Sequence, residues 1–298
     1  MDAIPLIDPP LQSLRLKDGR QLTWQEFGAP QGRPALYFHG GGSLSLEAGI
    51  YHREAVQRNI RLIATNRPGV SGSDRVRGRS AAGYADDLVE LLGHLRVQRF
   101  ACFGESNGGL MTMAIAATLA SRVVGAVPIN PTVPWFDPVA RSVTSGLAAW
   151  GYRLMRHWPR LLVRAAAGSG PRLRRQRAAA GPSAAGFSSL DLAGPPPGTE
   201  ADIAEIHWRF MDSHNPQALL DELDFATRPW GFDHYAIPVA LDFYCGVYDS
   251  QAPFALVLAD RNPNARFHYF AYGHHGFSHP DARRRIVDTI AGYFDAQA

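Results

Sequence analysis

Hydrophobic residues near the start of the chain follow two different spacings. LQSLRL and QLTWQEFG are short alternating runs on either side of the turn dipeptide DG, which predicts an antiparallel β-hairpin within residues 11–28. The compact apolar runs PALYFHG and RLIATNRPG follow, and each ends in Gly or Pro. Residues 47–59 between them have the spacing of a helix. Strand, helix and strand in this order predict a parallel sheet.

The same alternation continues towards the middle of the chain. A helical pattern at 81–97 leads into the strand-like run RFACFGE, and a second at 108–123 leads into VVGAVPINP. These strand-like runs are continuously apolar, as expected when helical crossovers bury both faces of a parallel sheet. The predicted fold class is therefore α/β, with a mostly parallel central sheet and flanking helices.

The alternation breaks between residues 131 and 233. Residues 139–167 have a helical period, and residues 178–200 are rich in Ala, Gly, Pro and Ser. The strand-like runs PVALDFYCGVYD and ARFHYFAY come afterwards. This order predicts a core made of residues 1–130 and 234–298, with 131–233 inserted as a helical cap.

The composition is that of an ordinary soluble globular protein. Of the 298 residues, 46% are hydrophobic and 19% are charged, and the formal net charge is +3. The sequence shows no secretory signal and no run of about 18 apolar residues that could span a membrane. We therefore expect a cytoplasmic protein that neither inserts into a membrane nor binds nucleic acid. A homodimer is compatible with the sequence, which does not decide the oligomeric state.

The basic residues are almost all arginine, since Lys17 is the only lysine. Eight arginines gather between Arg153 and Arg177. A solvated helical face explains them most simply, and an acidic ligand or a membrane surface is the alternative.

The motif GESNGG, residues 104–109, lies where an apolar strand turns into a helix. A serine at such a turn has strained backbone angles that expose its hydroxyl above the sheet, and glycines two positions before and after it prevent clashes. Ser106 is therefore the predicted nucleophile. A GxSxG motif alone is only moderately informative, so the strand and helix around it carry much of the prediction.

A nucleophilic serine needs a base and a carboxylate that orients the base. Asp249 ends a predicted strand and is the expected acid, whereas Asp242 lies inside that strand and is the weaker candidate. His274 and His275 follow the last predicted strand. We favour His275 as the base and keep His274 as the alternative. The histidines lack the spacing of metal ligands, and neither a metal nor a cofactor is expected.

The glycines of FHGGGS allow backbone amides to approach a substrate oxygen closely. The predicted oxyanion hole consists of the Gly41 and Asn107 N–H groups. A phosphate-binding loop is the rival interpretation, but the Lys-Ser or Lys-Thr of a Walker loop is missing. The further candidates for the substrate pocket, which we expect to be large and apolar, are His39, Gly40, Glu105, Trp135 and Trp208.

Together these motifs resemble the serine α/β-hydrolase superfamily, in particular its capped group with esterase-, lactonase- and prolyl aminopeptidase-like enzymes. The similar segments cover nearly the whole chain except the cap: HGGGS, NRPGVSGSD, GESNGG, RPWGFD, GVYD and PNARFHYFAYGHH. The resemblance implies that a cap over the strand ends selects the substrate. Aminopeptidases of the group usually have Pro and Trp where this chain has Gly42 and Asn107, which lowers that interpretation. Ser106 argues against the epoxide hydrolases and haloalkane dehalogenases of this fold, which use Asp.

The leading functional hypothesis is a serine hydrolase that cleaves an ester, thioester, lactone or amide of a small, largely apolar substrate. The alternative is a non-hydrolytic enzyme, such as a lyase, cyclase or acyltransferase, that uses the same serine and histidine. A binding protein on a retired hydrolase scaffold is less favoured, because all three positions of the triad are filled.

Overall fold

A computed structural model describes most of the chain outside the predicted cap. The described residues are 7–78, 80–144, 146–159, 161, 206, 209, 220–222, 224, 227–247, 249–270 and 280–297.

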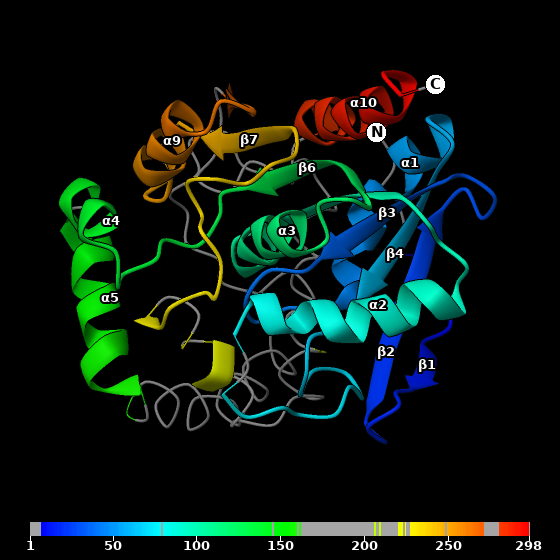
Figure 1. Ribbon diagram of the computed structural model, residues 1–298, viewed down its shortest axis with the longest axis horizontal. Helices are drawn as coiled ribbons and strands as arrows, with labels where there is room; N and C mark the ends of the chain where they lie inside the picture. The colour runs from blue at the N-terminus through cyan, green and yellow to red at the C-terminus, as the bar shows by residue number, and fades with distance from the viewer. Residues whose placement is uncertain are drawn as a thin grey trace, which may run out of the picture.

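The described residues form one eight-stranded sheet with the order β1-β2-β4-β3-β5-β6-β7-β8 (Figure 1). The two strands of the predicted hairpin pair antiparallel at one edge, β2 also runs antiparallel to β4, and the remaining pairs are parallel. The strands are β1 (Gln12–Arg15), β2 (Gln21–Gly28), β3 (Arg33–Phe38), β4 (Ile60–Thr65), β5 (Phe100–Glu105), β6 (Val123–Ile129), β7 (Leu241–Gly246) and β8 (Ala265–Phe270). The α/β fold class is confirmed.

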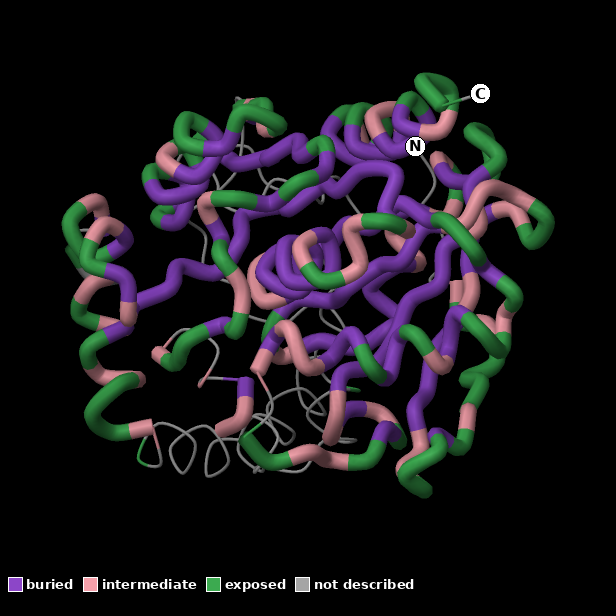
Figure 2. The backbone as a smooth tube through the Cα atoms, in the orientation of Figure 1, coloured by how far each residue is buried: buried purple, intermediate pink, exposed green. Residues whose placement is uncertain are grey.

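Helices cover both faces of this sheet. One core contains residues of α2 (Ala85–His94), α3 (Asn107–Thr118) and α9 (Ala252–Arg261). The other contains residues of α1 (His52–Gln57) and α10 (Pro280–Asp295). Figure 2 shows the central strands as buried along their length, which explains why β5 and β6 are continuously apolar in the sequence. Two short 3₁₀ helices, η1 (Ser45–Tyr51) and η2 (Ala82–Tyr84), precede α1 and α2.

Two helices, α4 (Pro138–Val143) and α5 (Gly146–His157), occupy the described start of the predicted cap. The sequence pattern predicts one continuous helical stretch here, but the helix is interrupted because Thr144 has an extended backbone and Gly146 has a φ of +61°. Except for a few positions, the rest of the 131–233 insertion lies outside the described residues. The cap and the domain boundaries therefore stay predictions.

The start of α4 is fixed to the segment where the chain returns to the sheet. Asp137 caps α4 by accepting hydrogen bonds from the N–H groups of Val139 and Ala140. Its other oxygen lies 3.0 Å from His234 Nε2 and accepts a hydrogen bond of 3.0 Å from the Tyr235 hydroxyl. One buried carboxylate thus joins the start of the predicted insertion to the first residues that follow it.

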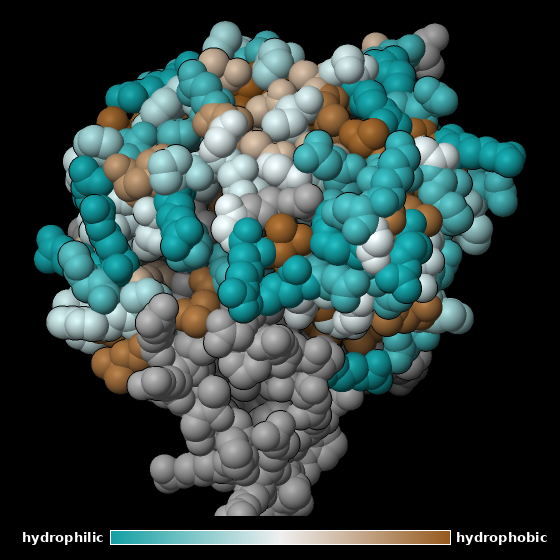
Figure 3. Space-filling model, turned by 60° about the horizontal axis from the view of Figure 1, so that its bottom comes forward, coloured by the Kyte–Doolittle hydropathy of each residue, from teal (hydrophilic) through white to brown (hydrophobic). Residues whose placement is uncertain are grey.

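Hydrophilic and hydrophobic residues both lie on the surface. On the face shown in Figure 3, hydrophobic residues among the coloured atoms occur singly or in small groups between hydrophilic ones. Within the part of the chain that the structure describes, no helix is long and apolar enough to cross a membrane. The homodimer stays a prediction.

Candidate active site

Ser106 occupies a strained turn between β5 and α3. Its φ of 53° and ψ of −115° are unusual for a residue with a side chain. The turn is tied to the end of β6, because Ser106 N–H donates to the Ile129 carbonyl at 2.9 Å and Thr132 N–H donates to the Ser106 carbonyl at 3.1 Å. Such a strained serine at the carboxyl edge of a parallel sheet is the geometry of a nucleophile elbow.

The glycines on both sides of Ser106 are required by close packing. A β-carbon at Gly108 would lie 1.9 Å from the Phe38 carbonyl oxygen, and one at Gly104 would lie 2.4 Å from the same oxygen. A β-carbon at Gly104 would also lie 2.8 Å from the Gly108 carbonyl oxygen. The motif therefore brings the elbow directly against the end of β3, where the glycine-rich loop (residues 39–43) begins.

Within this glycine-rich loop, the N–H groups on either side of Gly41 are bound by buried carboxylates. Gly40 N–H donates to Glu47 at 2.9 Å, and Gly42 N–H donates to Glu222 at 3.1 Å. Among the described residues, neither the Gly41 nor the Asn107 N–H has a hydrogen-bond acceptor. The two predicted oxyanion donors are thus among the N–H groups to which the described structure gives no acceptor.

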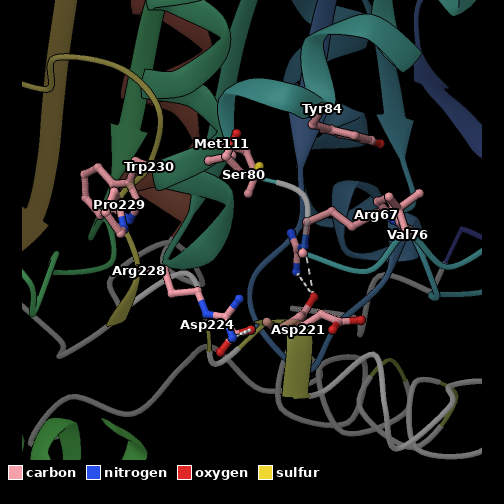
Figure 4. Close-up of a pocket in the computed structure, with 14 residues that line it drawn as sticks. Arg67, Val76, Ser80, Tyr84, Met111, Asp221, Asp224, Arg228, Pro229 and Trp230 are labelled. Atoms are coloured by element: carbon pink, nitrogen blue, oxygen red, sulfur yellow. Dashed lines mark hydrogen bonds and ion pairs between the residues drawn. The ribbon is translucent and has the colours of Figure 1, made fainter.

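The carbonyl groups of the glycine-rich loop are held by Arg67, which is only 2% exposed. Its guanidinium donates to the carbonyl oxygens of His39 and, at 2.8 Å, of Gly40. The same guanidinium forms an ion pair with Glu222, with hydrogen bonds of 2.9 and 2.5 Å to one carboxylate oxygen. Figure 4 shows Arg67 extending towards the 221–224 segment of the insertion. Together, Arg67 and Glu222 thus bind both carbonyl and N–H groups of the loop.

The buried ring of His39, the first residue of this loop, has two polar contacts. Its Nε2 accepts a hydrogen bond of 3.4 Å from the Arg67 N–H, and its Nδ1 lies 2.9 Å from the Gly40 carbonyl oxygen. Because a carbonyl can only accept, Nδ1 carries the proton and the ring is the neutral tautomer. Burial and the nearby Arg67 charge hold the pKa of His39 well below its usual value, which agrees with a neutral ring.

The side chain of Asn107 also faces the glycine-rich loop. Thr132 Oγ1 donates a hydrogen bond of 2.6 Å to Asn107 Oδ1. A β-carbon at Gly41 would lie 2.9 Å from Asn107 Nδ2. The Thr132 hydroxyl therefore turns the amide so that its NH₂ group lies beside Gly41.

Asp249 lies just after β7 and is buried, with 5% exposure. Its Oδ1 accepts a hydrogen bond of 2.8 Å from Gln251 N–H. Tyr152 on α5 lies within electrostatic range: burial, with the Asp249 charge adding to it, raises the pKa of Tyr152 to about 12. Trp135 stacks on Tyr152 with 5.3 Å between ring centroids. The predicted acid and the predicted pocket residue Trp135 thus lie near the same tyrosine.

Several predicted site residues cannot be placed or are placed elsewhere. His274, His275 and Trp208 lie outside the described residues. Asp242, the weaker acid candidate, is buried between Arg266, His268 and Tyr293 on β8 and α10. Glu105 is the last residue of β5, directly before Ser106, and is buried at 2% exposure.

A cavity of about 200 Å³ lies beside the Arg67–Glu222 pair (Figure 4). Its lining includes Arg67 and Glu222 together with Tyr84, Met111 and Trp230. Met111 is one helical turn beyond Asn107 on α3, but neither Ser106 nor the two predicted oxyanion donors line this cavity. The large apolar pocket expected from the sequence stays a prediction, because most of the predicted cap lies outside the described residues. Trp135 lines a second cavity, with Arg141, Arg153, Arg156 and His157.

Four residues of this site were not predicted from the sequence: Glu47, Arg67, Thr132 and Glu222. Arg67 lies in the NRPG segment that contributes to the family resemblance, which was the available signal for it. Glu222 lies in the predicted cap, and only the folded chain brings it to Gly42, 180 positions earlier. No sequence period marks such a long-range contact.

The chain is similar to known proteins in part of its sequence and in its fold. No family model matches the chain. The acetyltransferase component of the acetoin-cleaving system of Pseudomonas putida is 32% identical over 109 residues, or 35% of this chain and 28% of that protein. A non-heme haloperoxidase of Rhodococcus erythropolis is 31% identical over 119 residues, or 39% of this chain and 43% of that protein. The matches therefore span less than half the length of these two curated relatives.

Solved structures match over almost the whole chain. An esterase from Exiguobacterium antarcticum has a TM-score of 0.68 at 16% identity, covering 95% of this chain and 98% of its own. An α/β-hydrolase-fold protein from Chitinophaga pinensis has a TM-score of 0.66 at 16% identity (97% and 98% covered). The enol-lactonase from Burkholderia xenovorans has a TM-score of 0.63 at 15% identity (95% and 100% covered). The chain therefore has the α/β-hydrolase fold, as the sequence predicts.

Proposed function

We propose that this protein is a serine hydrolase that cleaves an ester, thioester, lactone or amide through an acyl-enzyme. The strained backbone of Ser106 between β5 and α3 carries the proposal, because it exposes the hydroxyl at the edge where the unused N–H groups of Gly41 and Asn107 lie. The similarity in fold to an esterase and an enol-lactonase supports the same reaction class.

In the proposed mechanism, Ser106 Oγ attacks the substrate carbonyl and passes its proton to His275, or to His274 in the other register. Asp249 orients that histidine. The Gly41 and Asn107 N–H groups stabilise the negative oxygen of the tetrahedral intermediate. The histidine then protonates the leaving group, which departs. In the second half of the reaction, the histidine takes a proton from water as the water attacks the acyl-enzyme, and it returns that proton to Ser106 as the acid is released.

The cavity beside the Arg67–Glu222 pair supports a small substrate. Its volume of about 200 Å³ lies below the range of about 300–1,000 Å³ common for ligand pockets. Tyr84, Met111 and Trp230 supply apolar surface. We therefore propose that this cavity receives a short, largely apolar acyl or leaving group.

A fluorophosphonate probe tests the nucleophile directly. Ser106 should displace fluoride from the probe, and mass spectrometry should locate the adduct on the peptide that contains residues 104–109. Ser106→Ala should abolish labelling. Ser71→Ala is the matched control, because Ser71 also has a positive φ, of 44°, but lies outside the strand-to-helix junction. Labelling that persists in Ser106→Ala would overturn the assignment.

Acyl transfer to an acceptor other than water is the second candidate. The similarity to part of an acetyltransferase component favours it. Adding an alcohol or a thiol during turnover separates the two reactions: a hydrolase releases mainly the free acid, whereas a transferase diverts the acyl group to the added acceptor.

A further inference from the structure

Glu222 connects the predicted cap to the glycine-rich loop through one buried side chain, which is 5% exposed. Its Oε2 accepts the Gly42 N–H, and its Oε1 accepts two hydrogen bonds from Arg67. These partners precede it by 180 and 155 positions. The carboxylate is therefore in contact with the loop that would form half of the oxyanion hole.

We propose that Glu222, paired with Arg67, is a positioning residue that sets the direction of the Gly41 N–H for catalysis. The inference rests on the proposed function, because it assigns a residue of the insertion to the geometry of that oxyanion hole.

The hydrogen bonds of the loop lead to this proposal. Three consecutive glycines, residues 40–42, have little intrinsic preference for one backbone conformation. Glu47 holds the N–H before Gly41, and Glu222 holds the N–H after it. The peptide group that carries the Gly41 N–H also contains the Gly40 carbonyl, which Arg67 binds at 2.8 Å, and Arg67 is itself held by Glu222. If Glu222 is lost, the Gly42 N–H and the Arg67 guanidinium both lose a partner, so the Gly41 N–H is held less firmly in one direction. Preorganised donors owe their effect to fixed direction, so catalysis should weaken.

The charges of Glu222 and Arg67 also bear on the proposed oxyanion hole. An isolated carboxylate beside an oxyanion hole would repel the negative oxygen that forms there. Arg67 compensates that charge through its ion pair with Glu222 at 2.5 Å, and both groups are buried. The pair can therefore anchor the loop without a net negative charge at the hole.

The chain provides a matched control in the preceding residue of the insertion. Asp221 forms an ion pair with Arg75 of the predicted core, with hydrogen bonds of 2.5 and 2.9 Å. Neither residue has a described hydrogen bond to the glycine-rich loop. Arg75→Ala therefore breaks a contact between the insertion and the core without removing a loop contact.

The test compares Glu222→Ala, Glu222→Gln and Arg75→Ala in the full chain. With a short acyl ester, Glu222→Ala should lower kcat by about 10- to 100-fold and change KM by less than about 3-fold. It should weaken binding of a boronic acid, which forms a tetrahedral serine adduct, by a similar factor. Glu222→Gln keeps an oxygen for Gly42 and should recover part of kcat. Arg75→Ala should keep kcat within about 2-fold.

Amide hydrogen exchange gives a readout that does not depend on catalysis. Exchange in a peptide covering residues 39–43 should become faster in Glu222→Ala and stay unchanged in Arg75→Ala. Equal exchange in the two variants would overturn the positioning role, and so would equal losses of kcat in an active enzyme. If the wild type neither reacts with fluorophosphonate nor hydrolyses esters, the proposed function fails while the exchange result still decides whether Glu222 positions the loop.

Discussion

Buried polar groups at the carboxyl ends of the strands differ in their hydrogen bonding from those near the amino end of β7. At the carboxyl edge, Ser106 and Asn130 both have positive φ angles, and among the described residues the N–H groups of Gly41 and Asn107 have no acceptor. Near the amino end of β7, the buried carboxylate of Asp242 has partners on both oxygens. Both regions are polar, but of these two sets of groups only the first includes N–H groups without an acceptor among the described residues.

The Asp242 cluster shows what a fully bonded buried charge looks like in this fold. Oδ1 accepts from Arg266 at 2.9 Å and pairs with His268 at 2.6 Å. Oδ2 accepts from Arg266 at 2.9 Å and from the Tyr293 hydroxyl at 2.6 Å. Such a cluster stabilises the fold because each group has partners, and for the same reason it offers little to a ligand. Unused donors and backbone strain are thus the two features on which the proposed active site rests.

Replacing Ser106 should have the largest effect on activity, and replacing Asp242 should have almost none. Ser106→Ala should lower kcat for short acyl esters by about 10³-fold or more, because the acyl-enzyme can no longer form. Its melting temperature should stay within a few degrees of wild type, since the substitution removes only one oxygen. Asp242→Asn is the counterpart and should leave kcat nearly unchanged. Similar losses of activity in both variants would remove the distinction between the two regions.

The close approach of the elbow to β3 predicts the next effect. Gly108→Ala places a methyl group against the Phe38 carbonyl, so we expect it to destabilise the protein by about 3 kcal/mol or more and to abolish activity. Gly93→Ala in α2 is the control, because a β-carbon there meets no atom within 4 Å. That variant should be as stable as wild type or up to about 1 kcal/mol more stable. Urea unfolding of the two variants measures both values.

Local patterns predicted the sheet and the elbow, and long-range contacts explain what they missed. The apolar runs at β3, β5 and β6 and the glycines around Ser106 report on neighbours close in sequence, so the fold class and the elbow geometry could be predicted. Glu222 reaches the site across 180 positions, and nothing near it in the sequence indicates its partner. Thr132 likewise requires knowledge of how the end of β6 packs against α3. The choice between His274 and His275 stays a prediction.

Removing the Asp242 charge should reduce stability moderately. Burial alone would raise the pKa of Asp242, but hydrogen bonds from His268, Arg266 and Tyr293 outweigh it and lower the pKa from 3.8 to about 2. Asp242→Asn should therefore lower the free energy of unfolding near neutral pH by about 1–2 kcal/mol, a range reduced because Arg266 is largely exposed.

The pH dependence provides a control for that prediction. A carboxyl group whose pKa is lower in the folded state contributes stability above its unfolded pKa and loses that stability as the pH falls towards the folded value. The difference in stability between wild type and Asp242→Asn should therefore shrink as the pH falls from about 4 to about 2. A difference that stays constant through this range would show that the charge is not the cause.

The smallest expected effect concerns the orientation of Asn107. Thr132→Val keeps the shape of the side chain but removes the hydroxyl that donates to Asn107 Oδ1. The amide beside Gly41 can then rotate, so kcat/KM should fall by only about 2- to 5-fold, the scale of one neutral hydrogen bond. Thr118→Val is the control, because the Thr118 hydroxyl donates to the Ala114 carbonyl within α3. If Thr132→Val reduces turnover as strongly as Glu222→Ala, the amide of Asn107 is itself a major donor at the carboxyl edge, and the oxyanion hole includes a side chain.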